Sequence, residues 1–163
     1  MNLHIRLATP SDVPRMLCLR DMALDIMIQS GNPHQWSEGY PAEATLQQDI
    51  TLGQSYLVVQ DEEVVGMFAL ADGPDPTYTK IYEGEWLDDS KPYKVLHRIA
   101  STPDSHGVFA AIIAFSMQQS SNLRIDTHRD NRIMQHLILK HGFAYCGIIY
   151  LLNGDERLAY QQI

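Results

Sequence analysis

Polar and titratable side chains gather in one short stretch, residues 126–131, which read Asp-Thr-His-Arg-Asp-Asn. On a strand Asp126 and His128 would share one face, where a carboxylate can orient an imidazole for acid–base chemistry. A metal site is the weaker interpretation, because no second histidine or cysteine pair stands at ligand spacing. These groups can also simply end a strand and cap a helix. We expect no metal, and we keep both residues as candidate substrate contacts.

A second candidate lies in residues 93–101, whose Tyr-Lys-Val-Leu-His-Arg-Ile-Ala-Ser pattern predicts a strand. Alternation places Tyr93, His97 and Ile99 on one face and Arg98 on the other. Because an imidazole titrates near neutral pH, His97 is a candidate base for a substrate ammonium, directly or through water, with Tyr93 as a second candidate. A single strand histidine can equally be a hydrogen-bonded packing residue, so both interpretations stay open.

These residues must be positioned by an alternating order of strands and helices within one predicted domain, residues 1–163. A chain of this length can bury about two thirds of its unfolded surface. Gly142 is placed to end a helix in the left-handed conformation. The patterns predict a strand over 5–8, a helix over 13–27, a hairpin over 56–70, a strand over 93–101, a helix over 107–119, a strand over 124–128, a helix opened by Asp130 or Asn131, and a hairpin over 146–160 turning at 153–155.

The run from residue 122 to residue 143 resembles the C-terminal half of a GNAT-superfamily N-acetyltransferase. In that family a strand ends in a polar cluster, an Asn opens a short helix, and the helix ends at Lys-x-Gly-Phe; here Asn131 and residues 140–143 match. The Ile-Arg-Leu-Ala-Thr opening at residues 5–9 matches as well. The resemblance implies an α+β fold of the GNAT type: a mixed, mostly antiparallel sheet of six to seven strands flanked by about four helices, with strands four and five splayed.

This resemblance implies an N-acetyltransferase that moves acetyl from acetyl-CoA to an amine of a small molecule or peptide. The amine attacks directly, while a backbone N–H on strand four polarises the thioester carbonyl. An alternative is a non-catalytic acyl-CoA-binding or protein-interaction module on the same fold. A toxin-like acetyltransferase acting on aminoacyl-tRNA is disfavoured, because the chain is acidic and lacks a basic patch.

The resemblance places the donor pyrophosphate at the turn before residues 107–119, because the start of a helix favours anions. The family signature there is Arg or Gln, two residues, Gly, one residue, then Gly or Ala. With His106 in the first place, Phe109 replaces the central Gly and Ala111 is the last small residue, so the loop is degenerate. In the family the Asn that opens the later helix contacts the pantetheine arm. The candidate cofactor-binding residues are Ile99, Ala100, Ser101, His106, Gly107, Val108, Phe109, Ala110, Ala111, Asn131 and Met134.

The leaving thiolate is the second departure from the family pattern. Many members protonate it with a Tyr in the sequence Asn-x-x-Ala-x-x-Leu-Tyr, whereas this chain has Met134 at Ala and Ile138 at Tyr. Because Ile138 cannot donate a proton, either the thiolate departs unassisted or a neighbouring group serves. The neighbouring candidates are Tyr145, Tyr150, Cys146 and His128, and Tyr145 joins Tyr93 and His97 in the candidate catalytic set.

Two aromatic groups are candidates for the acceptor side. Residues 31–41 join the first two helices, and in the family this connection folds over the acceptor pocket; Trp36 and Tyr40 lie in it. Tyr78 and Trp86 follow the hairpin. Such residues can bind a substrate or anchor a loop onto the core, and the sequence leaves both open. The candidate substrate-binding set is Trp36, Tyr40, Tyr78, Trp86, Asp126 and His128.

Composition limits the partners. Twenty acidic residues against twelve basic ones give a formal charge of −8, which argues against nucleic acid and favours an amine-bearing partner. No stretch resembles a signal peptide or approaches the roughly 18 apolar residues of a membrane span, so we expect a cytoplasmic protein without a membrane partner. The acceptor, the acyl length and the oligomeric state, including a homodimer, stay open.

Overall fold

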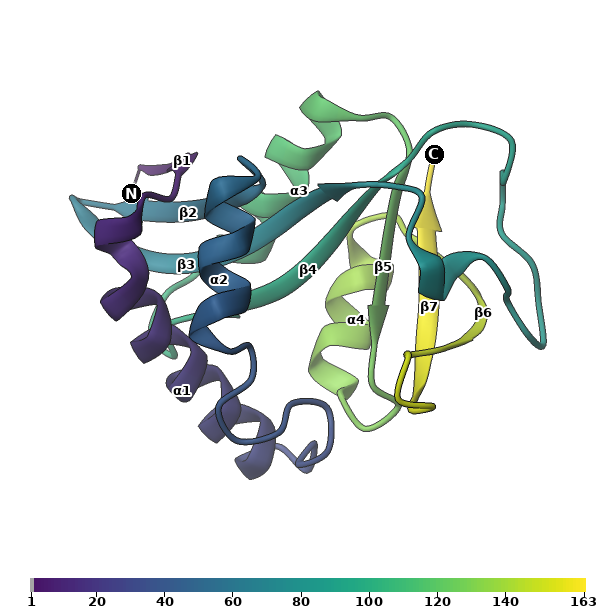
Figure 1. Cartoon of the computed structure of the whole chain (residues 1–163), viewed down its shortest axis with the longest axis horizontal. Helices are drawn as coiled ribbons and strands as arrows, with labels where there is room; N and C mark the ends of the chain where they lie inside the picture. Colours follow the sequence, from purple (N-terminus) through teal and green to yellow (C-terminus); the bar gives the residue numbers. More distant parts are fainter. Residues whose placement is uncertain (1) are drawn as a thin grey trace.

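The computed structural model describes residues 2–163 and shows a seven-stranded sheet flanked by helices (Figure 1). The strand order is β1-β2-β3-β4-β5-β7-β6. The predicted α+β GNAT-type fold is therefore confirmed. The elements are β1 (Leu3–Leu7), η1 (Pro10–Asp12), α1 (Val13–Gln29), α2 (Glu43–Thr51), β2 (Ser55–Gln60), β3 (Glu63–Asp72), η2 (Pro76–Tyr78), β4 (Lys94–Ser101), α3 (Val108–Gln119), β5 (Leu123–Thr127), α4 (Arg132–Lys140), β6 (Ala144–Tyr150) and β7 (Glu156–Gln162).

The junction of β4 and β5 is where the sheet opens. These two strands are parallel, whereas the other neighbouring strands pair antiparallel. Their pairing covers only Lys94–Leu96 against Leu123–Ile125, although β4 runs on to Ser101. The predicted splay is confirmed, and it leaves the end of β4 without a neighbour on that side.

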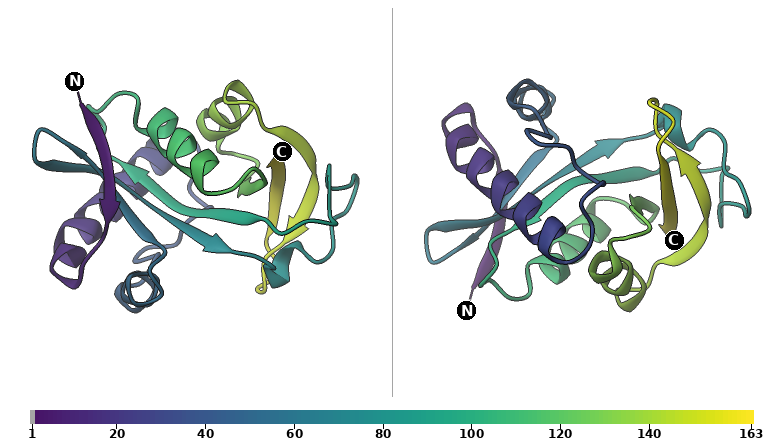
Figure 2. Two further views of the ribbon diagram at one scale, coloured as in Figure 1. Left: turned by 90° about the horizontal axis from the view of Figure 1, so that it is seen from above. Right: turned by 90° about the horizontal axis from the view of Figure 1, so that it is seen from below.

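Helices cover the two faces of the sheet in pairs, α1 and α2 on one face and α3 and α4 on the other (Figure 2). The largest apolar cluster lies between the sheet and α3 and α4, and includes Phe109, Ile112 and Ile138. A second cluster lies under α1 and α2. A third lies beneath residues 73–93, which run over the β5–β7 end of the sheet. This long segment replaces a helix as the cover of that end.

Local signals account for the helix ends that frame the site. Asn131 caps α4, since its side-chain oxygen accepts the Met134 backbone N–H at 3.0 Å. Gly142 follows α4 with a φ of +96°, as the helix-ending glycine was predicted to do. Gly66 allows β3 to approach α3 closely, because a Cβ there would lie 2.8 Å from a Val108 methyl group.

The predicted strict alternation along residues 93–101 is wrong from Arg98 onward. The β3–β4 register shifts between Met67 and Ala69, and Arg98 has a φ of +53°, so β4 contains a β-bulge. Because of the extra residue, the side chains after the bulge point to the face opposite to the one that strict alternation predicts. Ile99 packs into the α3 and α4 cluster, whereas Ala100 packs under α1 and α2. His97 and Ile99 therefore lie on opposite faces at the point where the strands separate.

None of the helices within residues 2–163 is both long and apolar enough to cross a membrane.

Candidate active site

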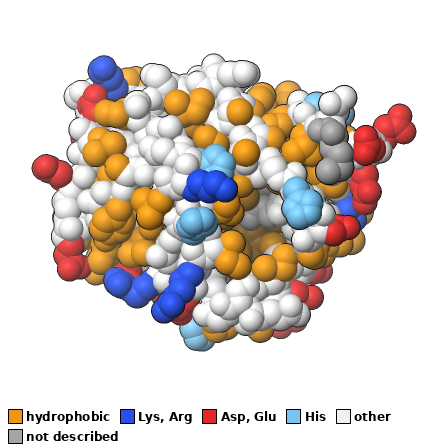
Figure 3. Space-filling model, turned by 180° about the vertical axis from the view of Figure 1, so that it is seen from behind, with side chains coloured by type: hydrophobic (Ala, Val, Ile, Leu, Met, Phe, Trp, Pro, Cys, Tyr) orange, Lys and Arg blue, Asp and Glu red, His pale blue; other side chains and the backbone are white. Residues whose placement is uncertain are grey.

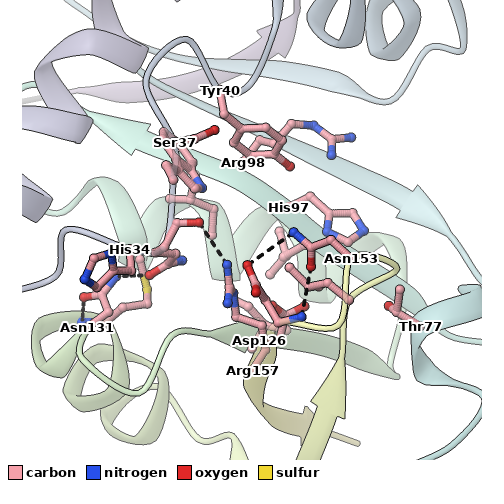
Figure 4. Close-up of a pocket in the computed structure, with 18 of the residues that line it drawn as sticks. His34, Ser37, Tyr40, Thr77, His97, Arg98, Asp126, Asn131, Asn153 and Arg157 are labelled. Atoms are coloured by element: carbon pink, nitrogen blue, oxygen red, sulfur yellow. Dashed lines mark hydrogen bonds between the residues drawn. The ribbon is translucent and has the colours of Figure 1, made fainter.

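A cavity of about 630 Å³ opens beside the splayed strands (Figure 4). Its walls come from the α1–α2 loop, η2, the bulged end of β4, the end of β5, the start of α4 and the β6–β7 turn. Six segments far apart in sequence therefore meet here. The polar residues of the cavity wall include Gln35, Asp75, His97, Arg98, Asp126, Asn131 and Arg157.

His97 and Asp75 form an imidazole–carboxylate pair in this wall. The Nε2 atom of His97 lies 3.3 Å from Oδ2 of Asp75, and both side chains are mostly buried. Burial alone would raise the pKa of Asp75, but hydrogen bonds from His97 and Thr77 outweigh it and hold that pKa at about 2. Asp75 is therefore a carboxylate at neutral pH, and it can orient the ring and stabilise an imidazolium.

A second carboxylate, Asp126, lies beside this pair in the neighbouring strand. Tyr78 donates a hydrogen bond to its Oδ2 at 2.6 Å. Burial raises the pKa of Asp126 above its ordinary value, although His97, the Tyr78 hydroxyl and Arg157 oppose the shift. Two neighbouring carboxyl groups thus have pKa values shifted in opposite directions, an arrangement that is common where protons are moved.

The segment that carries Asp75 and Tyr78 is held by a buried arginine. Arg124 has no exposed surface, and its guanidinium lies between the rings of Tyr93 at 3.8 Å and Trp86 at 3.9 Å. The Tyr93 hydroxyl accepts the Asp75 backbone N–H at 2.8 Å, and Trp86 donates to the Tyr78 carbonyl at 3.1 Å. Tyr93 thereby positions the backbone of Asp75, which precedes η2, and Trp86 positions the backbone of η2 itself.

The α1–α2 loop is fixed to the opposite strands through Gln35. Its side-chain oxygen accepts hydrogen bonds from Thr127 at 3.3 Å and Asn131 at 2.9 Å, and its backbone carbonyl accepts one from Arg157 at 2.9 Å. Both polar atoms of the Asn131 side chain are therefore engaged within the protein. The predicted contact between Asn131 and the pantetheine arm stays a prediction.

The bulge in β4 is held by an ion pair. Arg98 donates to both carboxylate oxygens of Asp49 in α2, at 2.7 and 2.8 Å, and both side chains are largely buried. Left-handed backbone is unfavourable for a residue with a Cβ, so this bidentate pair offsets the cost of the bulge. The carboxylate thereby fixes the strand edge that faces the cavity.

The turn that was predicted to hold the donor pyrophosphate leads into the start of α3. Gly107 precedes the helix with a φ of +75°, no side chain caps the helix, and the first intrahelical bond is from Ala111 to Gly107. The N–H groups of residues 108–110 consequently have no intrahelical partner. Phe109 turns its ring into the core against His141, at 5.2 Å between centroids, so it leaves its own N–H unobstructed. These groups suit a pyrophosphate.

The distribution of charged side chains on the α3 and α4 side of the surface is compatible with the binding of an anionic donor. Viewed from behind, this face is hollowed near its middle between apolar side chains (Figure 3). Histidine, lysine and arginine side chains gather near the hollow, whereas acidic side chains lie mostly at the periphery. An anion approaching this face meets little repulsion despite the net charge of −8.

The cavity brings together some of the predicted site residues and leaves others outside. In its wall are Trp36, Tyr40, His97, Ile99, Asp126, Asn131 and Met134. Tyr78 and Trp86 are almost fully buried and act as packing anchors. Tyr93 and His128 are also outside the wall. Tyr145 is half exposed on β6 and packs against Tyr160, again outside the wall. The remaining candidates lie outside the wall: Ala100 and Ser101 end β4, His106 and Gly107 lie in the turn that follows, and Val108, Phe109, Ala110 and Ala111 form the first turn of α3.

Several residues of the wall were not predicted from the sequence, among them Asp75, Gln35 and Arg157. The Asp-Pro-Thr sequence at 75–77 does signal a helix cap, and Asp75 indeed accepts the Thr77 backbone N–H at 2.9 Å. The distant partners of the three residues leave no local pattern. Gln35 and Arg157 are 122 positions apart in the chain.

Within residues 2–163 no three His, Cys, Asp or Glu side chains are arranged to hold a metal ion.

Comparisons with known proteins agree with this geometry. No protein-family model and no curated sequence matches the chain. Among solved structures, a GNAT-family acetyltransferase from Streptococcus agalactiae is 32% identical, with a TM-score of 0.89 over 99% of this chain and 95% of that one. A GNAT-family acetyltransferase from Listeria monocytogenes is 21% identical, with a TM-score of 0.72 over 98% and 94%.

More distant structures share the fold alone. The NatC complex bound to Gag peptide and CoA contains a chain that is 13% identical, with a TM-score of 0.64 over 99% of this chain and 98% of that one. The sheet opening, the bulged fourth strand and the uncapped start of α3 thus belong to a fold that occurs in CoA-bound proteins. With 32% identity over nearly its whole length to the streptococcal protein, the chain belongs to the GNAT family of acetyltransferases.

Proposed function

We propose that this protein transfers an acetyl group from acetyl-CoA to a primary amine of a small molecule or peptide. The observation that carries the proposal is the position of the Asp75–His97 pair in the cavity wall, where β4 separates from β5. A thioester that enters between the splayed strands would meet an amine in the cavity at this point. Acyl transfer in general follows from the family; the acetyl donor and the amine acceptor are the proposed part.

The donor is held by backbone groups and apolar surface. The free N–H groups at the start of α3 bind the pyrophosphate, and their dipole favours its charge. The edge of β4 beyond Leu96 is unpaired with β5, so its backbone N–H groups are available to the thioester carbonyl oxygen. Fixed donors at a developing oxyanion are among the largest contributions to acyl transfer.

His97 accepts the proton of the attacking amine. The amine nitrogen attacks the carbonyl carbon, a C–N bond forms, and the C–S bond breaks as the CoA thiolate leaves. Asp75 fixes the ring and stabilises the imidazolium that results. Asp126 faces the same cavity and attracts the cationic acceptor before it loses its proton.

The thiolate leaves without a tyrosine donor from the family position. Ile138 occupies that position and is fully buried in the core, and Tyr145 lies outside the cavity wall. Solvent therefore supplies the proton that the thiolate takes up.

A panel of primary amines tests the proposal. CoA thiol release from acetyl-CoA is followed for each amine, and the acetylated product is identified by mass spectrometry. We expect at least one amine to be acetylated at a rate well above the rate without enzyme. A folded protein that binds acetyl-CoA but acetylates no amine would favour the alternative of a non-catalytic acyl-CoA-binding module.

A further inference from the structure

Arg157 is a buried cation of the cavity wall. Only 5% of its surface is exposed. Its guanidinium donates to two backbone carbonyls, those of Glu156 at 2.7 Å and Gln35 at 2.9 Å. No ion pair joins it to a carboxylate in the described part of the chain, whereas Arg98 across the cavity is paired with Asp49. A guanidinium has five N–H donors, so donors remain for a ligand.

An unpaired charge is expensive to bury, and a protein normally pairs it or turns it toward a ligand. Arg157 is turned toward the space where a ligand would bind, because it faces the cavity (Figure 4). The planar guanidinium fits a carboxylate through two parallel hydrogen bonds. A cavity that contains this group is therefore suited to an anionic part of a substrate.

A negatively charged group, the carboxylate of Asp126, lies on the same face of the sheet as Arg157. Asp126 pairs with Ala159 across β5 and β7, so Arg157, two residues before Ala159, points to the same face as Asp126. Diagonal neighbours of this kind are roughly 7 Å apart. The two charges interact, because Arg157 opposes the upward shift in the pKa of Asp126, but they form no ion pair. A ligand with both charges can fit between them.

We propose that the acceptor is a small amine that also carries a carboxylate, in the manner of an amino acid. Its carboxylate binds Arg157, and its ammonium group lies toward Asp126 and His97, where it loses a proton and attacks the thioester. This rests on the proposed function, and it adds the chemical class of the acceptor. The hydrogen bonds of Gln35 fasten the α1–α2 loop across the cavity, which favours a small acceptor over an extended polypeptide.

Matched substrates test the role of the carboxylate without altering the protein. Each amino acid in a panel is compared with its own carboxamide, which keeps the shape and the amine but removes the negative charge. We expect kcat/KM to be on the order of tenfold to a hundredfold higher for the acids. The amine of a carboxamide is the weaker base and so is more often unprotonated, a bias that works against the expected result.

Two substitutions then assign the difference to one side chain. Arg157→Gln removes the charge, and it should abolish the preference for the acid by raising KM, while Arg157→Lys should retain part of it. Arg129→Gln is the matched control, because Arg129 pairs with Glu156 at 2.8 Å and its side chain is 59% exposed outside the cavity wall. This control should keep the full preference.

The outcomes separate the two proposals. If acids and carboxamides are acetylated equally well, or a peptide amine is a better acceptor than any free acid, the present inference is overturned and the proposed acetyltransferase stands. If acetyl-CoA binds but no amine is acetylated, the proposed function fails and this inference fails with it. Should Arg157→Gln not fold, the comparison of matched substrates with the wild-type protein still decides.

Discussion

The proposed acceptor side, in the cavity wall, and the proposed donor side, at the start of α3, rely on different kinds of groups. On the acceptor side, the groups to which we assign a role are side chains: Asp75, His97, Asp126 and Arg157, all in the cavity wall. On the donor side, side chains such as Phe109 pack in the core and the polar groups that remain are backbone N–H groups. Because the N–H groups at a helix start do not depend on the side chain, the proposed anion site does not require the glycine that Phe109 replaces in the family pattern. Substitutions should therefore affect turnover on the acceptor side, whereas removal of a core side chain such as Phe109 on the donor side should affect stability.

The largest expected effect is on turnover and comes from His97→Gln. Loss of a general base lowers kcat/KM about 10²- to 10⁴-fold, whereas the affinity for acetyl-CoA should stay within about twofold. Steady-state kinetics and calorimetry on the same samples separate the two quantities. His136→Gln, at an exposed position of α4, serves as the control. A His97→Gln protein with unchanged turnover would make His97 a packing residue.

The opposite behaviour is expected for Phe109→Ala on the donor side. Removal of a buried ring costs about 3–5 kcal/mol of unfolding free energy, because a cavity is left in the cluster between α3 and the sheet. At a temperature where the variant is folded, kcat should change by less than about threefold, since the backbone N–H groups remain. Urea unfolding and kinetics measure these effects. A stable variant with lost turnover would contradict the division between the two sides.

Asp75→Asn should have an intermediate effect on turnover. The amide still caps η2, but it cannot stabilise an imidazolium, so kcat should fall on the order of tenfold to a hundredfold. The unfolding free energy at neutral pH should fall as well, because the folded protein stabilises the ionised form of Asp75. Asp72→Asn is the matched control, because Asp72 is three positions away and its side chain is 82% exposed. Equal kcat values for the two variants would remove Asp75 from the catalytic group.

The smallest expected effect is the pH dependence of stability. The pKa of Asp75 is about 2 in the folded protein and 3.8 as its ordinary value, so the unfolded chain binds the proton more readily. Its contribution is therefore complete above pH 3.8 and is lost as the pH falls toward 2. Between pH 5 and pH 3, wild type should lose about 1 kcal/mol more than Asp75→Asn does. Urea unfolding at both pH values measures this difference, and parallel losses would contradict it.

Local signals in the sequence predicted the elements well, because hairpins, caps and helix ends depend on neighbouring residues. Asn131 caps the start of α4 and Gly142 follows its end in the left-handed conformation, as the sequence predicted. The bulge at Arg98 was not predictable, since alternation gives no sign of an inserted residue and its partner Asp49 lies in another element. The faces of residues 93–101 were therefore assigned correctly only up to His97.

The candidate site shows the same difference between local signals, which the sequence contains, and contacts between distant segments, which it does not reveal. His97 and Asp126 were found because they lie in strands that the family pattern locates, and both line the cavity. Asp75 reaches His97 only because Arg124, Tyr93 and Trp86 hold its segment over the sheet. Gln35 and Asn131 are 96 positions apart, and no local pattern encodes their contact. Long-range hydrogen bonds thus account for what the sequence left unpredicted.

The central claim is that backbone groups at the start of α3 bind acetyl-CoA, so that the acceptor side can act on it. Calorimetric titration of acetyl-CoA into wild type and Ala110→Asp tests it directly, because Ala110 is exposed in the first turn of α3. An Asp there favours the helix dipole but repels a pyrophosphate. We predict binding by wild type with a Kd on the order of micromolar, and at least about tenfold weaker binding by a variant of equal or higher stability. Folded wild type that does not bind acetyl-CoA, or equal affinities for both proteins, would contradict the claim.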